Sequence, residues 1–160
     1  MKRTLLITSL VLLLAVYVCA QGATPNFSGK WNLDAAKSDF GPAPPPESVV
    51  HVVEHKEPNL KVTTTQKTQA GETTNERNLT TDGKENTNKM RSPACEQEVK
   101  STSKWDGKKL VSQLKLQLQG TDIDIKDSWE LSEDGKLLTI TRDLKTPQGD
   151  FSQKTVFNKQ

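Results

Sequence analysis

Apolar and polar residues alternate with a period of two along most of the chain after residue 47. Turn-forming dipeptides interrupt this alternation about every 10–15 residues, which is typical of an antiparallel barrel or sandwich. The pattern predicts ten strands, near residues 27–33, 48–55, 59–68, 72–81, 84–92, 97–105, 108–118, 121–131, 136–145 and 150–158. Pro42 and the Pro44–Pro46 run exclude a helix or a central strand within residues 41–46. We therefore expect an all-β fold, a single up-and-down antiparallel β-barrel of eight to ten strands, with at most one short helical turn after the first strand.

Two-residue turns also predict which residues face each other on neighbouring strands. The turns at Gln119-Gly120, Asp134-Gly135 and Gln148-Gly149 agree on one apolar face. The partners that they give include Leu114 with Ile125, Trp129 with Ile140, and Ile140 with Phe157. This face is expected to line the interior of the barrel.

The same registers place a row of polar residues on this apolar face. The row runs across four strands through Ser112, Asp127, Arg142 and Thr155. Earlier turns extend it to Ser101, Arg77, Asn88 and Thr64. Two interpretations remain open. Asp127 and Arg142 could form an internal ion pair that fixes the register, since removing one partner of a buried pair costs about 3–5 kcal/mol. Alternatively, the row is a polar belt that holds the head group of a ligand, and the apolar residues hold its tail.

Residues 1–20 have the pattern of a secretory signal peptide. Lys2 and Arg3 precede an apolar run, and Val18-Cys19-Ala20 supplies compact residues before a cleavage site after Ala20. We expect residues 21–160 to form one barrel domain that is exported, either periplasmic or secreted. No later apolar run approaches the length of a membrane span, so no stable membrane insertion is expected.

Charge and reactive residues narrow the function further. The chain has 22 Lys and Arg against 20 Asp and Glu, and loss of Lys2 and Arg3 balances the two signs. The charges are interspersed, so no nucleic-acid partner is expected. His51 and His55 lie roughly 13 Å apart on an extended strand, too far to chelate one metal ion. Cys95 lies in a predicted turn with no histidine near it in sequence, which indicates an incidental thiol. No catalytic motif is present, and no cofactor is expected.

The first predicted strand carries a resemblance. Phe27-Ser28-Gly29-Lys30-Trp31-Asn32-Leu33 resembles the opening Phe-x-Gly-x-Trp-x-Leu of the calycins, the lipocalins and fatty-acid-binding proteins. Most of the chain after the signal also resembles uncharacterised exported lipocalin-like proteins of environmental bacteria such as acidobacteria. The calycin resemblance implies that Gly29 and Trp31 plug one end of the barrel, with Arg142 or Lys159 packed across the indole. The Pro-rich segment is too short for the helical lid of fatty-acid-binding proteins, so a more open mouth is expected.

Three functions remain as hypotheses. The leading one is a monomeric barrel that binds a small hydrophobic or amphipathic ligand. Its head group would lie near Ser112, Asp127, Arg142 and Thr155, and its tail against Leu114, Ile125, Trp129, Ile140 and Phe157. The second is an envelope interaction module with a packed interior. The third is a small barrel isomerase or cyclase that uses Asp127 as a base.

Overall fold

The computed structural model describes residues 24–92, 96–118, 120–147 and 149–160. The predicted signal peptide and Cys95 lie outside these residues. The ten predicted strands are all present, each within two residues of its predicted bounds. They are β1 (Gly29–Leu33), β2 (Ser48–Lys56), β3 (Asn59–Thr68), β4 (Gly71–Thr80), β5 (Asp82–Arg91), β6 (Glu96–Asp106), β7 (Lys109–Leu118), β8 (Thr121–Leu131), β9 (Leu137–Thr146) and β10 (Gly149–Lys159). One 3-10 turn, η1 (Ala35–Lys37), follows β1, and Asp34 caps it by accepting the backbone N–H of Lys37. The ten strands, with this turn as the one helical element among the described residues, confirm the predicted all-β fold class.

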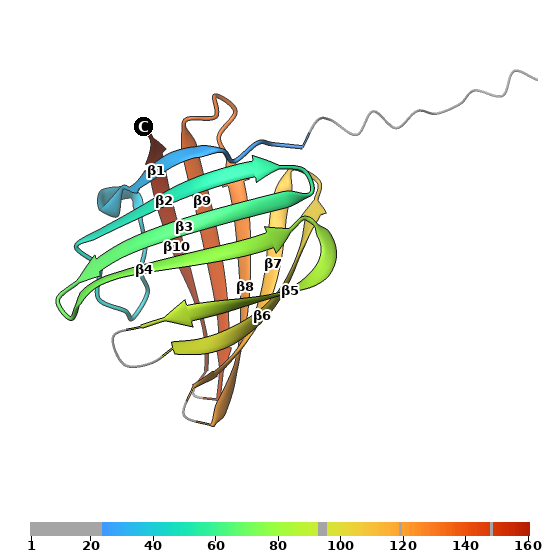
Figure 1. Cartoon of the computed structure of the whole chain (residues 1–160). Helices are drawn as coiled ribbons and strands as arrows, with labels where there is room; N and C mark the ends of the chain where they lie inside the picture. The colour runs from blue at the N-terminus through green and yellow to red at the C-terminus, as the bar shows by residue number, and fades with distance from the viewer. Residues whose placement is uncertain (1–23, 93–95, 119, 148) are drawn as a thin grey trace, which may run out of the picture.

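The strands form one antiparallel sheet that curls into a nearly closed barrel (Figure 1). The order in the sheet is β4-β3-β2-β1-β10-β9-β8-β7-β6-β5. Strands adjacent in sequence are therefore paired, except β4 and β5 at the two ends of the sheet, and β1 pairs with β10. After β1, Asp34 and Asp39 continue along β10 through backbone hydrogen bonds to Val156 and Lys154. This segment extends the contact between the first and last strands beyond the short β1.

The barrel closes between β4 and β5 through side chains instead of a backbone ladder. The Asn88 side chain accepts a hydrogen bond from the Asn78 backbone N–H (2.7 Å) and donates to the Asn78 carbonyl (3.0 Å). The Asn75 side chain makes the same pair of bonds with the backbone of Arg91, at 2.6 and 2.9 Å. Each asparagine amide thus takes the place of a peptide group from a missing neighbouring strand. We call this contact the β4–β5 seam.

The interior is divided into two apolar regions. One end, where β2 meets β3 and β8 meets β9, holds a continuous buried core around Phe27, Trp31 and Trp129. A smaller cluster around Val99, Leu114 and Ile125 lies toward the other end, on the wall made by β6, β7 and β8. We call these the closed half and the open half, and polar residues lie between them.

Two of the predicted hairpin registers are confirmed. Across β7 and β8, Ser112 pairs with Asp127 and Leu114 with Ile125. Across β8 and β9, Asp127 pairs with Arg142 and Trp129 with Ile140. These hairpins therefore place Asp127 and Arg142 side by side on the inner face.

The last hairpin has a different register from the predicted one. Gly149 pairs with Thr146, so Gly149 belongs to β10 and not to the predicted Gln148-Gly149 loop. This pairing shifts the partner of every β9 residue by two positions along β10. Each side chain therefore stays on the predicted face of the sheet but lies in a different row. Thr155 consequently faces Ile140, and its predicted place opposite Arg142 is wrong.

The hairpin between β6 and β7 shows the same type of error. Asp106 pairs with Lys109, which makes Gly107 and Lys108 the loop residues. Ser103 therefore faces Ser112, and Ser101 faces Leu114 one row away. Ser101 does not belong to the row in which the sequence placed it.

Candidate functional site

Asp127 and Arg142 form an ion pair inside the barrel. Arg142 donates from Nε to Oδ1 and from Nη2 to Oδ2, each at 2.7 Å, so the contact is bidentate. Burial alone would raise the pKa of Asp127, but Arg142 and, more weakly, Arg77 outweigh it and hold the pKa below its ordinary value. Asp127 also raises the pKa of Arg142. Both groups are therefore charged, and each neutralises the other.

Ser112 lies beside this pair in the polar row. Its hydroxyl is 2.7 Å from that of Ser103, and both serines are buried. On the other side of Arg142, the row continues to Gln153, which is half-buried. The sequence did not place Ser103 or Gln153 in the row, because the registers predicted from it for the β6–β7 and β9–β10 hairpins were wrong. Thr155 is half-buried and donates its hydroxyl to the Ile140 carbonyl at 3.3 Å.

Arg77 reaches the interior from β4, on the opposite wall. Its partner on β3 is Val62, which is fully buried, and Arg77 itself is only 9% exposed. Burial lowers the pKa of Arg77, although the charge of Asp127 acts in the opposite direction. Among the described residues, nothing forms a hydrogen bond or ion pair with its guanidinium.

His51 lies between the polar belt and the closed half. Its Nδ1 is 2.8 Å from the hydroxyl of Thr64, and its ring centroid is 4.5 Å from that of Phe157. Burial, and then the positive charges of Arg77 and Arg142, lower the pKa of His51 from 6.5 to about 3. His51 is therefore neutral at physiological pH. The sequence did not indicate this buried, neutral state.

Side chains on the inner face of the open half are not all buried. Leu114 and Ile125 are buried, as predicted for lining residues, and so are Trp129, Ile140 and Phe157 nearer the closed half. Further inward-facing residues are half-buried, namely Thr64, Gln66, Leu116, Ile123, Leu144 and Gln153. The Arg142 side chain is 36% exposed although its partner Asp127 is 1% exposed. The open half therefore borders space that solvent can reach.

The closed half contains Gly29 and Trp31. Trp31 is fully buried and donates its indole N–H to the Phe27 carbonyl at 2.9 Å. Lys159 lies over the indole, with Nζ 5.1 Å from the ring centroid, and Arg142 lies elsewhere. Gly29 has φ +141°, and a Cβ there would be 2.8 Å from Cε of Lys159. Glycine therefore allows the lysine to cross the indole.

Glu57 holds the aromatic residues of this end together. Its carboxylate accepts hydrogen bonds from Trp105 Nε1 at 2.8 Å, from the Thr81 hydroxyl and from His55 Nε2 at 3.2 Å. The Phe27 ring stacks on Trp105 with centroids 5.7 Å apart. His55 therefore has a structural role at this end, because its ring accepts the Phe27 backbone N–H and contacts Glu57.

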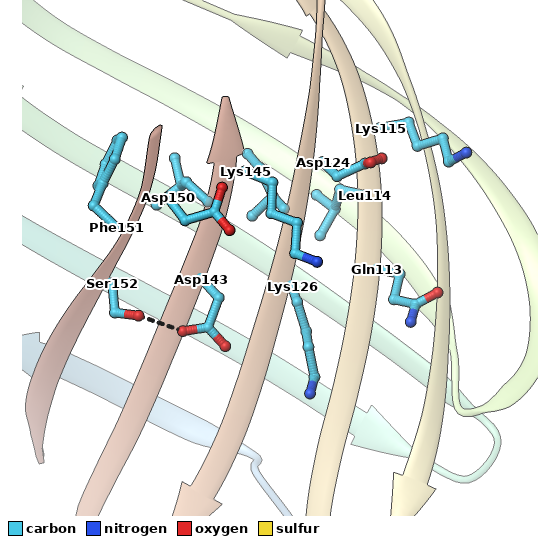
Figure 2. A pocket seen from close by; sticks show the side chains of 12 residues that line it. Gln113, Leu114, Lys115, Asp124, Lys126, Asp143, Lys145, Asp150, Phe151 and Ser152 are labelled. Carbon is cyan, nitrogen blue, oxygen red and sulfur yellow. Dashed lines mark hydrogen bonds between the residues drawn. The ribbon is translucent and has the colours of Figure 1, made fainter. Parts of the chain in front are cut away.

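A groove of about 720 Å³ crosses the outer face of β7, β8, β9 and β10 (Figure 2). Figure 2 shows two rows of polar side chains along it, one with Lys115, Asp124, Lys145 and Asp150 and the other with Gln113, Lys126, Asp143 and Ser152. Three lysines and three aspartates balance in charge, and most of these residues are exposed. Exposed charges contribute about 0–1 kcal/mol per pair. The groove offers no buried polar group to select a ligand.

The described residues contain no cluster of three or more His, Cys, Asp or Glu side chains that could hold a metal ion. Within the same ranges, no helix has the length and apolar content of a membrane span.

Several solved structures are similar in fold to this chain, at low sequence identity. The chain is similar to a secretory abundant heat soluble protein from Ramazzottius varieornatus, with a TM-score of 0.57 and 15% identity over 86% of this chain and 98% of that one. It is also similar to zebrafish ileal bile acid-binding protein in complex with cholic acid, with a TM-score of 0.53 and 18% identity over 84% and 98%. A variant of the fluorescent protein UnaG gives a TM-score of 0.54 and 18% identity over 83% and 95%.

Together with the strand order, these similarities define the fold as a calycin-like β-barrel. Neither a protein-family model nor a curated protein matches the chain.

Proposed function

We propose that this protein binds a small amphipathic or apolar molecule inside the open half of its barrel, as an exported monomer. The observation that carries the proposal is the exposure of inward-facing side chains. Arg142 is 36% exposed although it points inward, and Leu144 and Ile123 on the same face are half-buried. A packed interior would bury these groups, since protein cores are close-packed.

The lining of this space suits an amphipathic molecule. Val99, Leu114 and Ile125 form an apolar wall, and the polar belt borders it toward the closed half. Apolar lining with a few oriented polar groups is the usual character of ligand pockets. The neighbour in complex with cholic acid supports the proposal, because cholic acid is an amphipathic molecule.

The two competing functions fit the geometry less well. A packed interaction module would not leave the inner face of β9 half-exposed at Leu144. An enzyme that uses Asp127 as a base needs a carboxylate with a raised pKa, because a base must take up a proton near neutral pH. Asp127 instead has a lowered pKa and two hydrogen bonds from Arg142.

The proposal can be tested by titrating the purified protein with fatty acids, haem and phenolics while following tryptophan fluorescence. Binding inside the barrel should give a saturable change for at least one class, because Trp129 lies next to the polar belt. Leu144→Trp should abolish this binding by filling the inner space. Asp143 is adjacent to Leu144 in the chain but faces outward into the groove of Figure 2. Asp143→Trp should therefore leave ligand binding unchanged. No saturable change with any class, or the reverse effect of the two variants, would contradict the proposal.

A further inference from the structure

The described interior carries an unbalanced positive charge. Three charged residues reach it: Arg77 from β4, Asp127 from β8 and Arg142 from β9. Asp127 and Arg142 neutralise each other through two hydrogen bonds. The positive charge of Arg77 is then left over, because a neutral His51 contributes none.

Arg77 is available to a ligand in a way that Arg142 is not. Arg142 already uses Nε and Nη2 on Asp127. Arg77 is 9% exposed and has no hydrogen-bond or ion-pair partner among the described residues. Among the described residues, every side-chain nitrogen or oxygen that is closed off from solvent has a hydrogen-bond partner. The unpartnered guanidinium nitrogens of Arg77 must therefore border space that a water molecule, or a ligand, can enter.

A buried charge without a partner is unfavourable, and a bound counter-ion removes the penalty. A guanidinium prefers planar oxyanions because it can donate two parallel hydrogen bonds to them. Since one positive charge is unbalanced, a singly charged group neutralises the interior, whereas a doubly charged phosphate would leave an excess of negative charge.

We propose that Arg77 is the binding site for a singly charged oxyanion, a carboxylate or sulfonate, at one end of an amphipathic ligand whose tail packs on the apolar wall of the open half. This subsite rests on the proposed function. It lies on β4 beside the β4–β5 seam, where Asn88 is also buried. The polar row on β7, β8 and β9, in which the sequence placed the head group, lies on the other wall.

The test compares three ligands with the same 12-carbon tail: dodecanoate, dodecan-1-ol and dodecyltrimethylammonium. The affinity of each ligand is measured by its displacement of the neutral dye Nile red. The measurement is made on wild type, on Arg77→Gln and on the control Arg91→Gln. Arg91 is exposed on the other side of the seam and pairs with Glu96, so its substitution removes the same charge outside the barrel. Dodecyl sulfonate, tested in the same way, separates recognition of any singly charged oxyanion from recognition of a carboxylate.

Wild type should bind dodecanoate more tightly than dodecanol, and the ammonium ligand most weakly. Arg77→Gln should reduce the preference for dodecanoate over dodecanol about 10-fold or more, with dodecanol affinity unchanged, because a charged hydrogen-bonded pair is lost. Arg91→Gln should retain the wild-type preference. If both ligands bind and Arg77→Gln leaves their ratio unchanged, the subsite is overturned while the proposed function stands. If neither ligand binds to wild type, the subsite is overturned, and the proposed function is then decided by the haem and phenolic titrations.

Two further measurements apply if Arg77→Gln does not fold. Arg77→Met has a similar length and no charge, and it should lose the same preference. In the wild-type protein, the NMR shift of carboxyl-labelled dodecanoate reports its ionisation directly. The bound carboxylate should stay ionised to lower pH than the free acid, because a nearby opposite charge favours the charged form. A bound carboxyl that takes up its proton at higher pH than the free acid would overturn the subsite.

Discussion

Protonation of His51 is expected to be a major cause of acid unfolding in this barrel. The His51 side chain is buried beside Phe157, and Thr64 occupies its Nδ1. Burial, and then Arg77 and Arg142, lower its pKa from 6.5 to about 3, although Asp127 partly opposes them. In the unfolded chain the ordinary pKa returns. The unfolded chain therefore takes up a proton below pH 6.5 that the folded protein takes up only near pH 3, so stability falls as the pH falls through this window.

The size of this effect follows from the two pKa values. One pKa unit corresponds to about 1.4 kcal/mol, so the fall from 6.5 to about 3 corresponds to about 5 kcal/mol of folding free energy. Most of this loss occurs before pH 3 is reached. Between pH 7 and pH 4 the contribution of His51 should decrease by about 3 kcal/mol, a large share of the stability of a typical domain.

The assay is urea denaturation of wild type and His51→Gln at several pH values between 7 and 4. Glutamine retains a polar group for Thr64 but does not titrate. Carboxylates titrate in both proteins, so the difference between the two pH profiles isolates His51. Wild type should lose about 3 kcal/mol more than the variant. Parallel profiles would refute the reasoning, as would an NMR titration in which His51 takes up a proton near pH 6.5.

Three other substitutions test separate parts of the structure. Asp127→Asn should lower the free energy of unfolding by about 3–5 kcal/mol in urea, because the inward guanidinium of Arg142 loses its carboxylate partner. A loss below about 1 kcal/mol would show that the pair is effectively solvated. Asn88→Leu removes both bonds to the Asn78 backbone, so stability should fall by about 1–3 kcal/mol and amide exchange at Asn78 should accelerate; unchanged exchange would mean that the seam does not depend on this side chain. Lys159→Met should lower the free energy of unfolding, measured by thermal denaturation, by about 0.5–1 kcal/mol, because it removes the cation over Trp31. An unchanged or increased stability would show that this contact does not stabilise the fold.

The fold could be predicted from the sequence because strand alternation and turn residues act locally. Asp134-Gly135 set the register of β8 and β9, and this register alone brought Asp127 opposite Arg142. The β6–β7 and β9–β10 hairpins were harder, since several neighbouring residues in each turn could form the loop. A displacement of one loop residue changes the row without changing the face, which is why Thr155 was misplaced while Phe157 stayed on the apolar face.

The state of the site could be predicted only in part. The sequence placed Arg77 and Asn88 on the inner face, but it could not show that Arg77 lacks a partner. That property depends on which side chains the barrel brings near Arg77 from strands distant in sequence. The neutral state of His51 also depends on the folded barrel, since burial of the ring, and then two arginines from strands distant in sequence, lower its pKa.

The most direct test of binding inside the barrel is an NMR titration, with dodecanoate, of protein labelled at its methyl groups and backbone amides. Saturable shifts are predicted for Leu114, Ile125 and Leu144 in the open half, with little change at Leu60 and Leu138 in the buried core of the closed half. An absence of saturable shifts, or shifts confined to the backbone of the outer groove around Lys126, would contradict the account.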